Sequence, residues 1–349
     1  MSKTILFLYS ELMPYNLPWF SILTQQYGYK VIVVHWDTRK QTPYLPPTIP
    51  DVAFHLRSNF STIQLQQLAD NLQPDIIYSS GRMDSGYLRV CSHWKSKGSI
   101  TVCGFDTPWQ STWRQWIAVL GRSLFFKPYF THIWVPGRFQ YEYARKLGFA
   151  PNQILMNLYA ANTIPFRAKA SAKLASYPHR ILFVGRLTPE KGIQQLTKAF
   201  SELQSISPND WILTVVGDGS LKSSLPIHPS IEYIPFSSQV QLAQLASQSG
   251  IFCLPSPLEH WGVVVHELAA AGLPLLLSEQ CGAASEFLIN GFNGYFFKGG
   301  NIFDLQKKLL LMMSLPDTQL SEMGKNSQKL SERISAETSV ASLVSILNC

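Results

Sequence analysis

The chain has 349 residues, of which 46% are hydrophobic and 15% charged, a composition that excludes a disordered protein and suits two packed domains. Residues 1–165 hold 15 Lys and Arg against 8 Asp and Glu, whereas the rest of the chain holds 14 of each, so the whole net charge of +7 lies in the first half. Nucleic acid, an anionic membrane surface or an acidic substrate could account for this charge, but no recognition motif supports nucleic acid.

The cysteines are scattered and odd in number, which predicts neither a disulfide framework nor a paired metal site and favours a reducing cytoplasm. They are Cys91, Cys103, Cys253, Cys281 and Cys349. The apolar stretch 5–9 is too short for a signal peptide, and no run reaches the length of a membrane span. Cys349 lacks a prenylation context. We therefore expect a cytoplasmic protein, with any membrane contact at the cytoplasmic face.

Short apolar runs alternate with helical patterns through the first half, which predicts a parallel sheet covered by helices. Strands are expected at residues 4–9, 30–35, 75–79, 99–103, 132–135 and 154–159, and helices at 19–27, 63–71 and 140–147. Open parallel sheets bind ligands at the carboxyl ends of their strands. Polar residues in the loops that follow these strands are therefore candidate ligand-binding residues.

The loop after the first strand contains no glycine, so it is a poor phosphate cradle and suits hydroxyl groups better. Asp106 follows the strand 99–103, where catalytic side chains are often placed, but an Asp there could equally cap the next turn. In the same way, a lone Glu11 could simply be solvated. The candidates of this half are Glu11, Tyr15, Asn16, Arg82, Asp106 and Trp109.

Residues 109–130 carry three tryptophans beside basic residues. Helical spacing places five apolar side chains on one face, namely Trp113, Trp116, Ile117, Leu120 and Leu124. Such a helix suits a membrane interface, and together with the basic half-chain it indicates peripheral membrane contact. The alternative is a helix that packs on its own sheet.

Residues 160–178 show little periodicity and are expected to form a linker. The predicted domains are 1–165 and 166–335, with a last helix near 336–349 that packs back on the first domain. Strands of the second half are expected at 180–184, 211–216, 231–234, 251–255, 274–278 and 295–297. The predicted architecture is two doubly wound, Rossmann-like α/β domains that face a central cleft.

Two carboxylates of the second half flank a predicted helix start. Glu259 lies in a strand-to-helix loop, and Glu267 lies in the helix that begins after Gly262. Free N–H groups and the helix dipole make such a start an anion site. Carboxylates repel phosphate but accept hydrogen bonds from hydroxyls, and an anion with several hydroxyls describes a nucleotide sugar. The alternative for Glu267 is a place on a solvated helix face.

Cations and glycines near the ends of other strands complete this pattern. Arg186 and Lys191 flank the strand 180–184 and could neutralise a diphosphate leaving group. Gly185 and Gly217 allow close backbone approach. No Asp-x-Asp motif or His and carboxylate cluster predicts a metal site, so we expect neither a metal nor a cofactor.

Three motifs together resemble the family 4 glycosyltransferases, which are retaining enzymes of the GT-B fold. They are Val-Gly-Arg-Leu-Thr-Pro-Glu-Lys-Gly at 184–192, the Glu259-x7-Glu267 spacing followed by Leu-Ala-Ala-Ala-Gly-Leu-Pro, and Gly282…Glu286…Asn290-Gly…Asn293-Gly. The resemblance implies that the cations hold the donor diphosphate, that Glu259 binds the donor sugar and that Glu267 binds the ribose. The implied donor residues are Gly185, Arg186, Lys191, Gly217, Ile234, Phe236, Glu259, Trp261, Gly262, Val263, Val264 and Glu267. Those given a catalytic role are Asp106, Arg186, Lys191 and Glu259.

The first half departs from the family pattern. The frequent His-Gly-x-Asp sequence is Cys-Gly-Phe-Asp at 103–106, and the usual Asn-Gly-Val-Asp segment is Tyr-Ala-Ala-Asn at 159–162. We therefore expect a UDP- or GDP-sugar donor and an acceptor hydroxyl on a lipid-linked or cell-surface glycan, and the base, sugar and acceptor stay open. The alternatives are a nucleotide-sugar epimerase of the same fold and a catalytically silent nucleotide-sugar-binding subunit.

Overall fold

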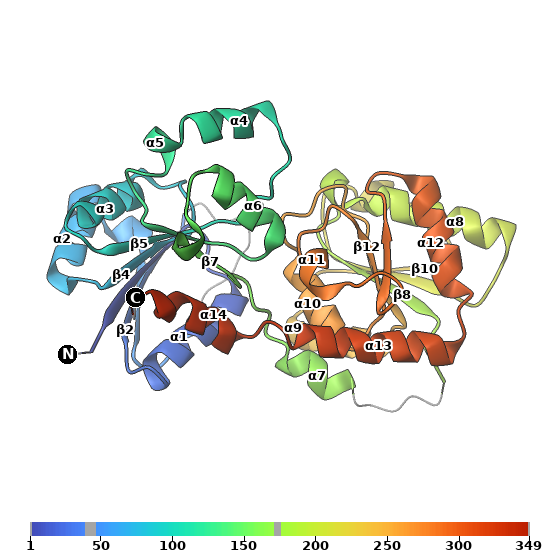
Figure 1. The fold of residues 1–349 in the computed structure, drawn as a ribbon. Coiled ribbons are helices and arrows are strands. Elements are labelled where there is room, and N and C mark those ends of the chain that lie inside the picture. Colours follow the sequence, from blue (N-terminus) through green and yellow to red (C-terminus); the bar gives the residue numbers. More distant parts are fainter. Residues whose placement is uncertain (1, 39–46, 171–175, 348–349) are drawn as a thin grey trace. The chain divides into compact units, whose positions relative to one another are not determined.

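The computed structural model describes residues 2–38, 47–170 and 176–347. The chain divides into two compact units, which are residues 1–160 with 334–349 (unit 1) and residues 161–333 (unit 2). Each unit is built on one parallel sheet with helices on its faces (Figure 1). Cys349 and part of the expected linker, residues 171–175, lie outside the described residues.

In the described part of unit 1, seven parallel strands form a sheet in the order β3-β2-β1-β4-β5-β6-β7. They are β1 (Thr4–Tyr9), β2 (Lys30–His35), β3 (Val52–Leu56), β4 (Ile76–Ser79), β5 (Ile100–Gly104), β6 (His132–Trp134) and β7 (Ile154–Leu155). The strand order reverses between β1 and β4, and loops at such a reversal form the usual ligand crevice of a doubly wound sheet.

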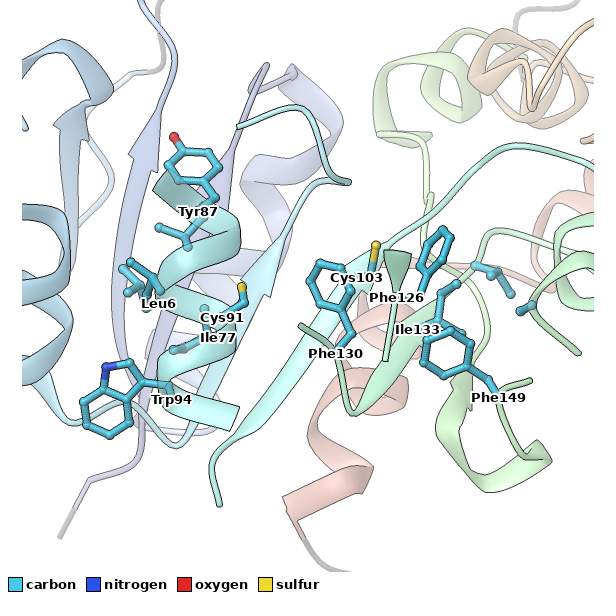
Figure 2. Close-up of a cluster of buried hydrophobic side chains, with 14 of the residues drawn as sticks. Leu6, Ile77, Tyr87, Cys91, Trp94, Cys103, Phe126, Phe130, Ile133 and Phe149 are labelled. Atoms are coloured by element: carbon cyan, nitrogen blue, oxygen red, sulfur yellow. The ribbon is translucent and has the colours of Figure 1, made fainter. Parts of the chain in front are cut away.

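Two apolar cores cover the faces of this sheet, because successive side chains of a strand point to opposite faces. Ile5 and Phe7 belong to the core with Trp19 of α1 (Leu17–Gln25), and α14 (Ala336–Val344) packs against α1 on that face. Leu6 belongs to the other core, beneath α2 (Thr62–Leu72), α3 (Ser85–Ser96) and α6 (Arg138–Lys146). Figure 2 shows this second core, with the Trp94 side chain of α3 among its members.

In the described part of unit 2, six parallel strands form a second sheet in the order β10-β9-β8-β11-β12-β13. They are β8 (Arg180–Val184), β9 (Ile212–Val216), β10 (Ile231–Ile234), β11 (Ile251–Leu254), β12 (Leu275–Ser278) and β13 (Gly294–Phe297). The helices are α7 (Ile164–Ala170), α8 (Ile193–Ile206), α9 (Gln239–Ser247), α10 (Val263–Ala270), α11 (Ala284–Phe287), α12 (Ile302–Met313) and α13 (Asp317–Ser331). Helix α8 packs against α12, whereas α10 packs against α7 and α13.

The structure corrects the expected elements at four places. Residues 109–130 form two short helices, α4 (Trp113–Leu120) and α5 (Arg122–Phe125), because the chain turns at Gly121. The strand expected at 154–159 ends at Leu155, and Asn157 has a φ of +64°, which a continuing strand does not allow. Edge strand β3 was not anticipated, since its side chains are only partly buried. The expected linker contains α7, which the buried Phe166 anchors.

Candidate functional site

An ion pair joins two of the predicted residues at the carboxyl end of the unit 2 sheet. The Lys191 ammonium lies 2.5 Å from a carboxylate oxygen of Glu259, and the Ser256 hydroxyl donates to the same oxygen at 3.2 Å. Gly192 makes this approach possible, because its φ is +68° and a Cβ there would lie 2.4 Å from the Pro255 carbonyl oxygen. Both charged side chains are largely shielded from solvent, so their attraction is stronger than that of a surface pair.

Two glycine turns lie beside this pair. A Cβ on Gly217, after β9, would lie 1.9 Å from the carbonyl oxygen of Gly185, after β8, so only glycine fits there. The Gly217 N–H donates to the carbonyl of Ile234 at 2.9 Å, and the Phe236 N–H donates to the Asp218 carboxylate at 2.8 Å. The loops after β8, β9 and β10 are therefore held against one another by close backbone packing and by these hydrogen bonds. Asp218 was not among the predicted site residues, although it directly follows a predicted strand and a glycine.

Helix α10 begins beside Glu259. Gly262 occupies its N-cap position in the left-handed region and offers no side chain to receive the first N–H groups, those of Val263 and Val264. These groups carry the positive end of the helix dipole. The neighbouring Trp261 is buried, and among the described residues its indole N–H has no acceptor. The loop therefore offers hydrogen-bond donors, and the start of α10 offers a partial positive charge. Both suit an anion that carries polar substituents.

Glu267 is buried, which rules out the solvated helix face as its place. Its Oε1 accepts a hydrogen bond of 2.9 Å from the Gln239 side chain, at the start of α9. Burial raises the pKa of Glu267 to about 7, and the bond from Gln239 opposes this shift only in part. Such a carboxylate gains from further hydrogen-bond donors, which ligand hydroxyls would supply. Gln239 was missed, because nothing local in its helix marks it as a partner of a residue 28 positions away.

His266 was also missed, although it directly precedes Glu267. Its Nδ1 accepts from the Ala161 N–H at 3.1 Å and its Nε2 donates to the Ser331 carbonyl at 2.8 Å, which sets the tautomer. The ring stacks on Phe287 with 4.4 Å between centroids. Burial lowers the pKa of His266 to about 4, against the opposing effect of the Ser331 bond. His266 therefore stays neutral and fastens α10 to residues near the two places where the chain leaves unit 2.

Arg186 lies apart from the inner ion pair. Its guanidinium contacts Glu190 at 3.5 Å and is largely exposed, so this contact contributes little to stability. Phe236 is also exposed, at the end of β10. Both side chains are open to a ligand, whereas the Lys191 ammonium is already held in place by Glu259 and has two further hydrogens with which to donate.

In unit 1 the predicted residues fall into two groups. Asp106 and Tyr15 meet through Tyr159, whose hydroxyl donates to Asp106 Oδ2 at 3.3 Å and whose ring lies 5.4 Å from that of Tyr15. Burial and the Asp106 charge both raise the pKa of Tyr159 well above its usual range. Glu11 is half-buried, whereas the buried Asn16 accepts from the Met13 N–H at 3.1 Å and so holds the loop itself.

The second group contacts α4 and α5 instead. The Arg82 guanidinium lies 4.6 Å from the centre of the Phe126 ring, a cation–π contact. The Trp109 ring meets that of Trp116 edge to face at 5.2 Å. Arg82 and Trp109 thus support a neighbouring surface, and Asp106 with its tyrosines is the better candidate for contact with a substrate.

A pocket of about 300 Å³ in unit 1 escaped the sequence analysis. Trp36 and Arg57, which follow β2 and β3, line it together with Asp84 at the start of α3. Both Arg57 Nε and the Trp36 indole N–H donate to the same Asp84 oxygen at 2.9 Å. Partial burial opposes the shift, but these bonds hold the pKa of Asp84 below its usual range. Of the two donors, only Trp36 follows a strand that the sequence predicted, the one at 30–35, and this was the available signal.

Comparison with known proteins identifies unit 2. The profile of the family "Glycosyl transferases group 1" matches residues 167–330, which contain the ion pair, the glycine turns and α10. The matched residues, just under half of the chain, place unit 2 among the group 1 glycosyl transferases. An uncharacterized glycosyltransferase of Haemophilus influenzae is 32% identical over 168 residues, 46% of each chain. A glycogen synthase of Mycobacterium tuberculosis is 30% identical over 154 residues, 42% of this chain and 36% of its own.

The matched part spans less than half of the length of these relatives. The whole fold has its counterpart in solved structures. HepE of Anabaena, solved in complex with UDP and glucose, covers 99% of both chains with a TM-score of 0.72 at 15% identity. At that identity the likeness establishes the fold alone. Together with the two Rossmann-like sheets, it confirms the predicted GT-B class for this chain.

Proposed function

We propose that the protein is a retaining glycosyltransferase that transfers a sugar from a UDP- or GDP-sugar to a hydroxyl group of a glycan acceptor. The observation that carries the proposal is the shielded Lys191–Glu259 pair, which lies at the end of the sheet beside the uncapped start of α10. A nucleotide sugar has a diphosphate between two rings that carry hydroxyl groups. The cation and the helix start suit the diphosphate, and the carboxylate suits the hydroxyl groups.

The diphosphate is assigned to the positive groups. Lys191 and the N–H groups of Val263 and Val264 bind its oxygens, and the exposed Arg186 turns from Glu190 to the outer phosphate. Fixed cations and helix dipoles stabilise the charge that develops on a leaving group without having to reorganise, which lowers the barrier to its departure. No metal is needed for this role.

The two carboxylates are assigned to hydroxyl groups. An ionised carboxylate only accepts hydrogen bonds, so Glu259 accepts from the donor sugar while Lys191 neutralises its charge. Glu267 accepts from the ribose hydroxyls. Because burial holds the pKa of Glu267 near 7, a nucleotide that donates to it also favours its ionised form. Ile234 and Phe236 are assigned to the base.

In the proposed reaction the acceptor oxygen bonds to the anomeric carbon on the face from which the phosphate leaves. The bond from that carbon to the phosphate oxygen breaks, and the acceptor proton passes to a donor phosphate oxygen, so no enzymic nucleophile is required. Asp106, whose carboxylate already accepts a bond from Tyr159, positions the acceptor hydroxyl. Together with Tyr15, it defines the acceptor side of unit 1.

The proposal is tested by screening nucleotide sugars by thermal shift and then measuring transfer with those that stabilise the chain. A ligand at a hundred times its dissociation constant stabilises by about 2.7 kcal/mol, which is readily measured. UDP- or GDP-sugars should stabilise the wild type and not Lys191→Ala. Lys198→Ala is the matched control, since that lysine is an exposed residue of α8. Stabilisation without transfer would favour a silent binding subunit, and release of an epimer without acceptor would favour an epimerase.

A further inference from the structure

Helices α4 and α5 lie at the periphery of unit 1 (Figure 1), and one side of them is apolar and not covered by any other described element. Five large apolar side chains of these helices are between 49% and 80% exposed, namely Trp113, Trp116, Ile117, Leu120 and Leu124. We call them the α4–α5 face. They are the same five that helical spacing had placed together, and the structure shows that they do not pack on the sheet.

The opposite side of these helices is firmly attached to unit 1. Val119 and Phe126 are buried in the core under α3. Gln115 is buried and donates to the Pro108 carbonyl at 2.7 Å, while its oxygen accepts from the Gln110 N–H at 2.8 Å. These contacts show that α4 and α5 already have a side that packs on the core of unit 1. The exposed α4–α5 face is therefore not the core-facing side of these helices.

The charged residues of the segment that forms this face have one sign. Residues 107–141 contain no Asp or Glu, so the cations Arg114, Arg122 and Lys127 have no acidic neighbour in this segment. All three are exposed, and Arg114 lies over the Trp113 ring at 5.3 Å. Tryptophan, leucine and arginine on one short helical surface are the combination that binds at a membrane interface, where apolar side chains enter the acyl boundary and cations meet lipid headgroups.

We propose that the α4–α5 face docks this protein on the surface of an anionic lipid bilayer. A second copy of the chain is the main competitor for the face. An isologous contact, however, would bring Arg114, Arg122 and Lys127 of both copies together with no acidic residue of the segment between them. A bilayer with anionic headgroups supplies both the apolar layer and the opposite charge. No helix within the described residues is long and apolar enough to span a membrane, so this contact is peripheral.

The position of the face gives it a consequence for the acceptor. Trp116 contacts Trp109, only three residues after Asp106, and Gln140 donates to the Asp106 carbonyl at 3.1 Å. Docking therefore brings the carboxyl end of β5 close to the membrane surface. If the proposed transfer is correct, on which this step rests, the acceptor is a lipid-linked sugar. The docking itself does not depend on the transfer activity.

The test is sedimentation of the full chain with vesicles of phosphatidylcholine alone or with phosphatidylglycerol added. The wild type should sediment with the anionic vesicles at low salt, be released by high salt, and show a blue shift of tryptophan emission. Leu120→Ser with Leu124→Ser should lower the water-to-vesicle partition constant by roughly tenfold or more. The reason is that serine lacks the favourable free energy of moving an apolar leucine side chain from water into the bilayer. Arg114→Gln, Arg122→Gln and Lys127→Gln combined should abolish the preference for anionic vesicles.

Matched variants in unit 2 are the controls. Ile206→Ser with Ile227→Ser replaces two other exposed apolar side chains and should leave vesicle binding unchanged. Nucleotide thermal shifts of all variants report separately on the donor site, so a failure of docking is distinguishable from a failure of the proposed function. Wild type that stays in solution with anionic vesicles would overturn the docking proposal. The proposal would also be overturned if the wild type were a dimer, the Leu120→Ser, Leu124→Ser variant were a monomer, and neither protein bound vesicles.

Discussion

The candidate site for the sugar donor in unit 2 and the candidate site for the sugar acceptor in unit 1 are held in place by different kinds of contact. In unit 2, Lys191 and Glu259 are paired and Glu267 is buried before any ligand binds, and backbone glycines fix the surrounding turns. In unit 1, Asp106 accepts a hydrogen bond from Tyr159, whose ring packs against Tyr15. A diphosphate has the same chemistry in every donor, so preset charges and backbone suit it. Acceptor molecules differ from one enzyme to another. A site made of side chains suits them, because side chains can be substituted without a change in the backbone of the sheet.

The strongest test of this contrast is Lys191→Ala. We expect turnover to fall by about 10²–10³-fold, as for loss of one group that stabilises transition-state charge. The variant also leaves Glu259 shielded and unpaired, so thermal unfolding should be measured beside turnover. Lys191→Ala with Glu259→Gln removes both charges and should recover stability but not turnover. Full activity in either variant would contradict the role of this lysine.

Asp106→Asn probes the other side of the contrast. Transfer should fall by roughly 10–100-fold, because the carboxylate that positions the acceptor hydroxyl is replaced by an amide. Nucleotide binding, measured by thermal shift, should stay at the wild-type value. Asp70→Asn, on the exposed surface of α2, is the control. A loss of nucleotide affinity in Asp106→Asn would show that the two sides are not separable.

Glu267→Gln should weaken the nucleotide and strengthen the fold. Removing a charged acceptor of ribose hydroxyls should lower affinity by about tenfold. The folded pKa of about 7 lies above the unfolded value of 4.5, so in the wild type the free energy of unfolding falls as pH rises between these values. The variant lacks this loss and should be more stable by up to about 3 kcal/mol at pH 8. Denaturant unfolding at pH 5 and pH 8 measures the difference, and an equal effect at both pH values would contradict the buried, protonated state.

His266→Phe should give a pH dependence of the opposite sign, with little effect on nucleotide affinity. The folded pKa of about 4 lies below the unfolded value of 6.5, so the wild type loses stability as pH falls through this range. Phenylalanine keeps the stacking on Phe287 but leaves the Ala161 N–H and the Ser331 carbonyl without a partner. The wild type should therefore be the more stable above pH 6.5, with an advantage that shrinks toward pH 4. An advantage that does not change with pH would argue against a buried neutral His266.

Periodicity in the sequence predicted most of the fold, because alternating βα patterns are local. The same patterns placed Glu259 after a strand and Glu267 in the following helix, as the structure has them. The hydrogen-bond partners of the candidate site residues could not be predicted from local sequence patterns. Gln239 binds Glu267, and Tyr159 binds Asp106 across 53 residues, through contacts that only the folded sheet creates. The functional roles of all these residues remain predictions.

The central claim is that unit 2 holds a nucleoside diphosphate through Lys191 beside α10. Calorimetric titration of the wild type and of Lys191→Ala with UDP, uridine, GDP and guanosine tests it most directly. We predict that the wild type binds one diphosphate at least about tenfold more tightly than its nucleoside, which is about 1.4 kcal/mol, and that Lys191→Ala loses this preference. Equal binding of diphosphate and nucleoside by the wild type, or a preference that survives in Lys191→Ala, would contradict the claim.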